Sequence, residues 1–367
     1  MVLEQFKVQE TDLIRIREED LRRTVAEIFK KMGLSTHDSD QGADVLVMAD
    51  LRGVESHGVS NTLRSYVKDY ENGSLNPATG YQLLRETPGT AVIDAERRLG
   101  IVVGAQAMAL AIEKAAQVGV GVVTVRNSGH LGAVGYYTMM AAKKNMVGVC
   151  FGCSGMPTPS VVPTFASSPM FGTNPISIAA PARKEAPFLF DIATSAISGN
   201  KVRLAVRLQT PLLPGWVADQ KGQPLAEETL VFDRNQFSLL PLGGTREHGS
   251  HKGYGLAMMT EILAAILSGS IPIMLDNLSG AKGHFAAYDI SAFTDIEAFK
   301  DQMDQMLEHL RSAPPAEGHE RVLYPGLLEH EEEGQRRING IPLHREVIDW
   351  FDSITKELGI DPLRVLS

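Results

Sequence analysis

The sequence predicts a mixed α/β (α+β) fold, with helices at both ends of the chain and short strands through its middle. Apolar residues recur at helical spacing in residues 18–32, and a last helix is expected over residues 345–358. Short β-branched runs, such as residues 119–125 and 147–151, indicate buried strands. No G-x-G-x-x-G motif follows an early strand, so a Rossmann nucleotide-binding domain is not expected.

Length and composition indicate a globular protein with a large core. The chain has 367 residues, of which 44% are hydrophobic and 22% are charged. The net charge of −9 argues against nucleic acid or an anionic membrane as the main partner. The longest apolar run, residues 255–272, contains Glu261 and is expected to be a buried helix rather than a membrane span. No signal-peptide pattern is evident, and two cysteines indicate no disulfide framework, so a cytoplasmic location is expected.

A Ser-His-Gly turn lies between two predicted helices near the N-terminus. The first of these begins after Ser35, which is expected to cap it with Asp38 in the capping-box position. The second follows Ser56 and His57, which form a candidate acid–base pair at a helix start. A histidine that serves only as a turn or cap residue is an equal alternative.

Arg52 and Arg64 flank this turn. Either could hold a substrate carboxylate, because a guanidinium group matches a carboxylate with two hydrogen bonds. A surface ion pair is the default interpretation for any single arginine.

A second histidine, His130, lies in a glycine-spaced turn between a predicted strand and a helix expected over residues 138–145. Gly129, Gly132 and Gly135 keep side chains away from this turn, so a ligand can approach the backbone closely. The helix start that follows favours anions. The alternative is a tight turn with a surface histidine.

Several other polar residues occur at the ends of predicted strands. Cys150 and Cys153 form a single C-x-x-C pair, which is better explained by two small core residues than by a metal site, and no metal is expected. Asp191 lies in an apolar run, so its carboxylate must be paired; it could orient a histidine, bind a ligand group or cap the turn that follows. Lys252, in a second glycine-rich loop, could contact a phosphate, although P-loop spacing is absent.

Eight ordered motifs resemble the malate/L-lactate dehydrogenase family that lacks a Rossmann fold. This family includes ureidoglycolate and sulfolactate dehydrogenases, diketogulonate reductase and cyclic-imine reductases. The motifs are S-H-G-V at 56–59, N-S-G-H-L-G-A-V-G-Y-Y at 127–137, F-G-T-N-P at 171–175, D-I-A-T-S at 191–195, H-K-G-Y-G-L at 251–256, G-H-F at 283–285, Y-P-G at 324–326 and G-I-P-L at 340–343.

The resemblance implies an NAD(P)-dependent oxidoreductase that transfers hydride between a nicotinamide and a small 2-hydroxy or 2-oxo acid of the malate or lactate type. Alternatives are a Δ1-piperideine/pyrroline-2-carboxylate reductase, a ureidoglycolate-type dehydrogenase and a non-catalytic family member. It also implies a homodimer acting on a carboxylate substrate. In this family the cofactor domain has a mixed, largely antiparallel sheet, here expected over residues 78–316 with a helical insertion. Residues 1–77 and 317–367 would form a helical domain.

The resemblance assigns roles where residues match. His130 would be an acid–base catalyst or a cofactor contact, and Ser56, His57 and Asp191 would match a proton relay of the imine reductases. Arg183 would lie near the adenosine ribose, where it could meet a 2′-phosphate. The residues expected to bind the cofactor are His130, Leu131, Gly132, Ser154, Asn174, Arg183, Asp191, Ile192, Ala193, Lys252, Pro325 and Gly326.

One departure affects the substrate site. The family carries an arginine four residues after the Ser-His histidine, where it grips the substrate carboxylate, and this chain has Asn61 there. Arg64 lies one helical turn further on and is the expected substitute.

Overall fold

The computed structural model describes residues 12–155, 158–275 and 280–366. A seven-stranded sheet runs through its centre in the order β2-β3-β4-β10-β5-β6-β7. The strands are β2 (Gln82–Glu86), β3 (Thr90–Asp94), β4 (Val120–Ser128), β5 (Met146–Cys153), β6 (Ile176–Ala180), β7 (Phe188–Ile192) and β10 (Ala281–Asp289). Only β3 and β4 pair in parallel, so the prediction of a mixed, largely antiparallel sheet is confirmed.

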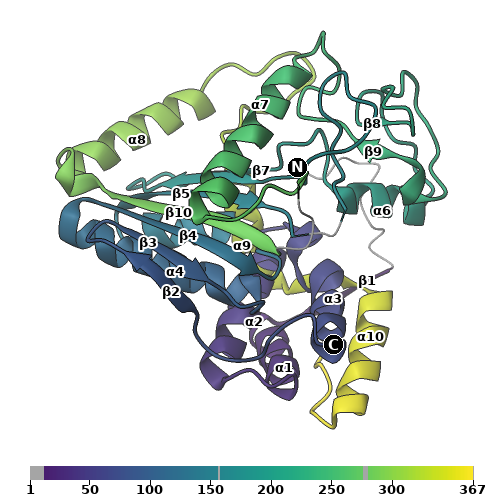
Figure 1. Ribbon diagram of the computed structural model, residues 1–367, viewed down its shortest axis with the longest axis horizontal. Coiled ribbons are helices and arrows are strands. Elements are labelled where there is room, and N and C mark those ends of the chain that lie inside the picture. The colour runs from purple at the N-terminus through teal and green to yellow at the C-terminus, as the bar shows by residue number, and fades with distance from the viewer. Residues whose placement is uncertain (1–11, 156–157, 276–279, 367) are drawn as a thin grey trace.

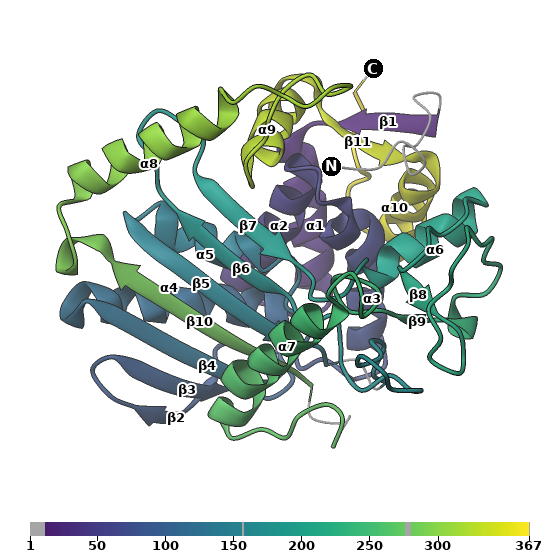
Figure 2. The same ribbon diagram turned by 90° about the horizontal axis from the view of Figure 1, so that it is seen from above.

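Helices cover both faces of this sheet (Figures 1 and 2). On one face lie α4 (Gly100–Val118) and α5 (Gly135–Ala142); on the other lies α7 (Ser250–Thr260), which continues through a π-helical turn, Glu261–Ala265, and a 3-10 turn, Ile266–Ser268. By length and composition alone α4 could cross a membrane, but its apolar side chains are used in packing against the sheet and the helical part. The helix α5 begins at Gly135, the last glycine of the His130 turn. This is three residues before residue 138, where the sequence analysis expected the helix to begin.

The two ends of the chain build one helical part. It contains α1 (Glu18–Lys31), α2 (Thr36–Leu51), α3 (Val59–Glu71), α9 (Leu327–Asn339) and α10 (Arg345–Leu358), together with an antiparallel ribbon of β1 (Leu13–Ile16) and β11 (Ile341–His344). Ser35 Oγ accepts a hydrogen bond from the Asp38 N–H at 3.1 Å, so the predicted cap is confirmed. Phe29, Leu63 and Phe351 share a core with Ile101 of α4, so the helical part also packs against the sheet part.

The segment between β7 and α7 forms a smaller lobe with its own apolar core around Val202, Leu212 and Val217 (upper right in Figure 1). It holds α6 (Gly199–Leu208), a ribbon of β8 (Val217–Ala218) and β9 (Ser238–Leu239), and the turn Arg234–Gln236. A last helix, α8 (Ile296–Arg311), follows the turn Ile290–Ala292 and runs along the outer side of the sheet. Both cysteines are buried and free, as expected of core residues.

Candidate active site

Two histidines from distant turns meet at the junction of the helical part and the sheet. His57 ends the 3-10 turn Glu55–His57, and His130 follows the end of β4. Their rings stack with centroids 5.7 Å apart and planes 13° from parallel. The structure therefore brings together the two histidines that the sequence singled out.

Each histidine has its Nδ1 occupied by a neighbouring group. Ser56 Oγ lies 2.9 Å from Nδ1 of His57. The Tyr66 hydroxyl lies 2.8 Å from Nδ1 of His130, and the Gly132 N–H donates to the same nitrogen at 3.3 Å. The Nε2 atoms are the ring nitrogens left for other partners.

The surroundings of both rings favour neutral imidazoles. Loss of hydration lowers the pKa of His57 to about 4. The same effect, with the nearby His57, lowers the pKa of His130 to about 3, although His130 keeps one side open to solvent. At neutral pH the pair is uncharged, and each ring can donate or accept a proton at a ring nitrogen.

Two buried polar side chains, Asp50 and Arg336, fix the turn that carries His57. Asp50 Oδ2 accepts the Val59 N–H at 2.8 Å and so caps α3. Burial raises the pKa of Asp50 to about 8. Arg336 of α9 donates to the Asp50 carbonyl at 2.7 Å and to the Glu55 carboxylate at 2.8 Å. The C-terminal part of the chain therefore helps to fix the position of His57.

Asp191 lies at the edge strand β7 and faces α5. Its Oδ2 accepts the Gly135 N–H at 2.7 Å, in the first turn of the helix that follows the His130 loop. Surrounding protein and the nearby Glu329 raise the pKa of Asp191 to about 6. Within the described part of the chain no hydrogen bond joins Asp191 to His57. Ser56 and His57 are thus paired as expected, whereas the third member of the expected relay is bound to a helix N-terminus.

The Pro325-Gly326 turn adjoins Asp191. The Pro325 carbonyl accepts the Leu189 N–H at 3.1 Å, which attaches the turn to β7 two residues before Asp191. Gly326 has φ +95° and approaches Leu189 so closely that a side chain would collide with the strand. The turn therefore lies beside the strand that carries Asp191 and leads into Ile192 and Ala193.

Other expected cofactor residues lie at the ends of β5 and α7. Asn174 is fully buried; its amide oxygen accepts the Ser154 N–H at 3.4 Å, and its amide nitrogen donates to Glu261 at 2.9 Å. Asn174 therefore positions Ser154 through contacts inside the protein. Lys252 is exposed in the first turn of α7, and Leu131 is buried in the His130 loop.

Two of the expected substrate ligands contact the protein itself. The Arg52 guanidinium donates to Glu333 at 2.9 Å and is largely buried. The Asn61 amide donates to the Glu55 carbonyl at 2.7 Å and closes the turn before α3. Both contacts stabilise the helical part.

Arg64 and Arg183 are paired in the same way. Arg64 lies over the Trp350 ring, 5.4 Å from its centroid, and 3.7 Å from Glu346 of α10. Arg183 is paired with Glu297 and with Asp301, the latter at 2.7 Å, on the exposed side of α8. Neither arginine is without an acidic partner.

Three residues around this site were not singled out from the sequence: Tyr66 and Asn200, which contact the histidine turns, and Lys201, which follows Asn200 in the chain. Tyr66 lies on the buried face of α3; a tyrosine on a buried face usually needs a hydroxyl partner, and that was the available signal. Asn200, at the start of α6, donates to the Ser56 carbonyl at 2.6 Å. Lys201 follows it, is partly buried, and has a pKa lowered by desolvation, with no acidic partner in the described part of the chain.

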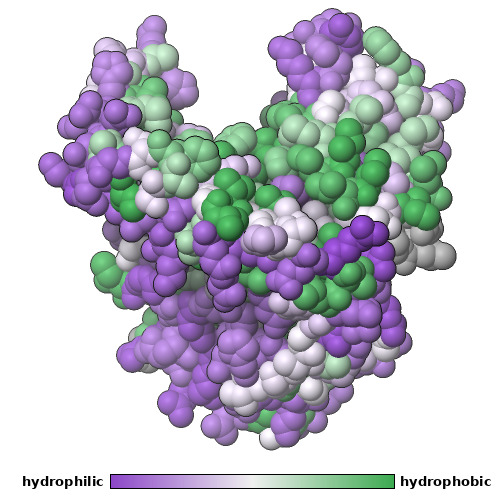
Figure 3. Space-filling view, turned by 60° about the vertical axis from the view of Figure 1, so that its left-hand side comes forward, coloured by the Kyte–Doolittle hydropathy of each residue, from purple (hydrophilic) through white to green (hydrophobic). Residues whose placement is uncertain are grey.

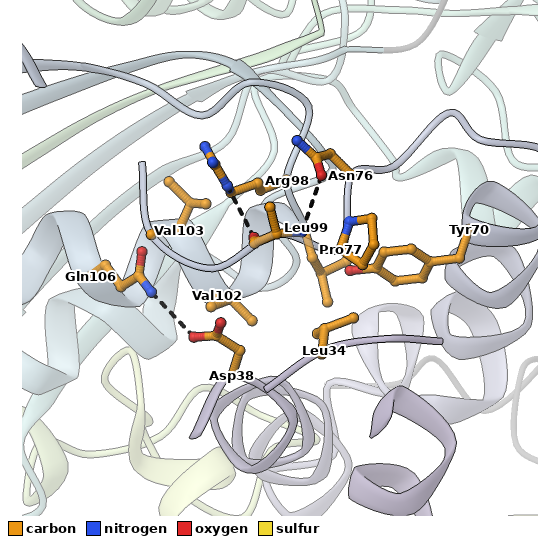
Figure 4. Close-up of a pocket in the computed structure, with 12 residues that line it drawn as sticks. Leu34, Asp38, Tyr70, Asn76, Pro77, Arg98, Leu99, Val102, Val103 and Gln106 are labelled. Carbon is orange, nitrogen blue, oxygen red and sulfur yellow. Dashed lines mark hydrogen bonds between the residues drawn. The ribbon is translucent and has the colours of Figure 1, made fainter. Parts of the chain in front are cut away.

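A small cavity lies apart from these groups, between α2, α3 and α4 (Figure 4). Its volume of about 10 Å³ is the room of a single water molecule. Asp38 accepts from Gln106 at 3.3 Å beside it, and the Tyr70 hydroxyl is directed toward it. No expected site residue lines it, so the histidine pair does not belong to this cavity. Among the described residues no group of histidine, cysteine and acidic side chains could hold a metal ion.

Two neutral imidazoles at the edge of a non-Rossmann sheet are groups that can accept and donate a proton, as the acid–base groups of enzymes do. Comparison with known proteins agrees. A family model described as malate/L-lactate dehydrogenase matches residues 16–351. The chain belongs to this family, and it is a hydroxy-acid dehydrogenase, an oxidoreductase acting on CH–OH groups.

Relatives and solved structures cover almost the whole chain. A malate dehydrogenase of Pyrococcus abyssi is 38% identical over 96% of this chain and 97% of its own length. An L-sulfolactate dehydrogenase of Methanocaldococcus jannaschii is 33% identical over 94% of this chain and 98% of its own. The structure of a malate dehydrogenase from Pyrococcus horikoshii superposes with a TM-score of 0.87 at 36% identity and covers 97% of this chain and 99% of that one.

Proposed function

We propose that this dehydrogenase interconverts a small 2-hydroxy acid and the matching 2-oxo acid, of the malate or lactate type, with NAD or NADP as hydride carrier. The observation that supports this most directly is the stacked pair of His57 and His130, in which each Nδ1 has a neighbour and each Nε2 is left over. The names of the relatives, malate and sulfolactate dehydrogenases, support a substrate with a carboxylate or sulfonate beside the hydroxyl carbon.

The residues expected to bind the cofactor fit a nicotinamide dinucleotide. Lys252 is an exposed cation in the first turn of α7, with no acidic partner in the part of the chain that the structure describes, which suits a phosphate. Asp191, Ser154 and the Pro325-Gly326 turn offer polar atoms on either side of the His130 loop. When bound, the nicotinamide supplies the hydride acceptor, and the histidine pair handles the proton.

Lys201 is our proposed partner of the substrate carboxylate. Arg52, Arg64 and Asn61 remain candidates from the resemblance, but each already has a partner inside the chain. Lys201 is partly buried and unpaired among the described residues, and its neighbour Asn200 is bonded to the His57 turn. A charge in that position would orient the hydroxyl carbon toward the histidines.

We also propose that the enzyme is a cytoplasmic homodimer. A surface that such a dimer could bury is present on α7 and the turns that continue it. In Figure 3 two raised parts of the surface flank a hollow. Apolar side chains gather on the right-hand part, on the side of α7, whereas the left-hand part, on the side of α8, is mostly hydrophilic. The exposed apolar residues at helical spacing there are Met258, Ile262 and Ile266.

Light scattering tests the dimer. The wild-type mass should correspond to two chains, and Ile262→Asp should give one. Ile338→Asp, at an isoleucine on α9 that is still more exposed (79% against 53% for Ile262), is the control and should remain a dimer. A single-chain mass for the wild type would refute the proposal.

The activity is tested by following NADH and NADPH oxidation with oxaloacetate, pyruvate and a cyclic ketimine side by side. We expect turnover with a 2-oxo acid and little with the ketimine; the reverse would make the protein an imine reductase. No turnover with any of them would indicate a non-catalytic family member.

His57→Ala and His130→Ala should each lower kcat by roughly 10²-fold or more. Full turnover in either variant would remove that histidine from the catalytic role.

A further inference from the structure

Tyr66 contacts the histidine pair from the buried face of α3. Its side chain is only 3% exposed, and its hydroxyl oxygen lies 2.8 Å from Nδ1 of His130. The hydroxyl therefore cannot turn toward bulk water; it contacts His130, and the Thr62 side chain on the same helix also interacts with it. A buried phenol and a ring nitrogen in this arrangement constrain where the proton of the imidazole resides.

The backbone decides which of the two groups donates. The Gly132 N–H points at the same Nδ1 at 3.3 Å, and an amide N–H can only donate. Nδ1 of His130 is therefore an acceptor, and its neutral ring carries the proton on Nε2. Burial also raises the pKa of Tyr66 well above its ordinary value, so the phenol keeps its proton and donates it to Nδ1.

We propose that Tyr66 is a positioning residue that holds His130 in the Nε2–H tautomer, so that His130 is the hydrogen-bond donor of the site and His57 is the base. This inference rests on the proposed hydroxy-acid oxidation. A neutral ring that carries its proton on Nε2 could take up another proton only on Nδ1, where the new N–H would face the Tyr66 and Gly132 donors. His57 has no such restriction, because Ser56 Oγ can accept from its Nδ1–H and leave the Nε2 lone pair free.

The step balances in the following way. The substrate O–H bond breaks, and its proton forms an N–H bond at Nε2 of His57. The C–H bond breaks with its electron pair, for which an oxidised nicotinamide would supply the hydride acceptor when bound, and the C–O bond becomes C=O. The Nε2–H of His130 donates to that oxygen throughout. In the reductive direction His57 returns the proton to the oxygen.

Tyr70 offers a matched control. It lies one turn further along the same helix, it is also largely enclosed, and its hydroxyl has no hydrogen-bond partner in the described part of the chain. Tyr66→Phe and Tyr70→Phe each remove one oxygen atom from a packed ring. Only the first removes a donor from His130.

The test measures the tautomer directly by long-range ¹H–¹⁵N correlation of histidine-labelled protein, with His130 assigned through His130→Gln. In the wild type we expect a protonated Nε2 and an unprotonated Nδ1. Tyr66→Phe should raise the fraction of His130 in the Nδ1–H form, because only the longer contact from the Gly132 N–H at 3.3 Å then opposes that form, and Tyr70→Phe should not. An Nδ1–H form in the wild type, or an unchanged tautomer in Tyr66→Phe, would overturn the proposal.

Kinetics provides the second readout. Tyr66→Phe should lower kcat roughly tenfold, the effect of one lost hydrogen bond, with a smaller change in KM and an altered pH profile. Tyr70→Phe should leave kcat and its pH profile as in the wild type. If the wild type turns over no 2-oxo acid, the proposed function fails, whereas the tautomer measurement still decides the role of Tyr66.

Discussion

Arg336 provides a sharp test of how the two ends of the chain fix the site. Its side chain is 8% exposed, and it donates to the buried Asp50 carbonyl at 2.7 Å, to Glu55 at 2.8 Å and to Glu332 at 2.6 Å. Arg336→Met keeps most of the volume and removes all three hydrogen bonds. The change therefore separates charge and hydrogen bonding from packing.

The size of the effect follows from which partners water can replace. Glu55 and Glu332 are 42% and 45% exposed, so solvent compensates for most of their loss. The backbone carbonyl of Asp50 is buried and keeps only the Gly53 N–H, at 3.1 Å, when Arg336 is removed. A hydrogen bond to a charged group contributes ~1.5–3 kcal/mol. We expect the free energy of unfolding to fall by about 2 kcal/mol in total.

The assay is urea unfolding followed by circular dichroism, with kcat measured on the same preparations. Arg337→Met is the matched control: the adjacent arginine is 44% exposed and pairs with Glu18 and Glu333 at the surface, so its loss should cost ~1 kcal/mol or less. Arg336→Met should also lower kcat, because Arg336 holds the turn that carries His57. Equal unfolding effects for the two variants would refute the reasoning.

Three further predictions follow from the site. Because the folded protein lowers the pKa of His130 from near 6.5 to about 3, its neutral form stabilises the fold above pH 6.5 and this contribution is lost as the pH falls toward 3. His130→Gln should therefore lose less stability than the wild type on acidification in urea titrations, and equal slopes would contradict this. Glu297→Gln releases Arg183 from one of its acidic partners, so the ratio of kcat/KM for NADP over NAD should rise roughly threefold or more. An unchanged ratio would place Arg183 away from the adenosine. Lys201→Met should raise KM for a 2-oxo acid roughly tenfold or more, with Lys221→Met, an exposed lysine of the same lobe, as the control that stays unchanged.

Local features of the fold were predictable from the sequence because their causes are local. The cap at Ser35 depends on a residue three positions away, and the helix Arg345–Leu358 was expected with the bounds that the structure gives. The absence of a Rossmann motif was likewise a statement about a short stretch of chain. Each of these depends on spacing within one or two turns of backbone.

Pairings between distant segments were not predictable in this way. The ribbon of Leu13–Ile16 with Ile341–His344 joins the two ends of the chain, and neither strand was expected. A four-residue strand is recognisable only through its partner, and the partner is chosen by the packing of the helices around it. The helix Gly199–Leu208 was not predicted, because its apolar face can be recognised only from the lobe core that it forms with Leu212 and Val217.

For the site, the sequence by itself determined which residues are chemically able to act and where the backbone turns: Ser56 with His57, His130 among its glycines, and Asp191 in an apolar strand. Only the tertiary structure decided their partners. It stacked the two histidines, placed the Tyr66 hydroxyl on one of them and gave the Asp191 carboxylate to the Gly135 N–H. The physical reason is that an amino acid carries its donors, acceptors and titratable groups with it, whereas hydrogen-bond partners and pKa shifts depend on distances between segments that are far apart in the chain.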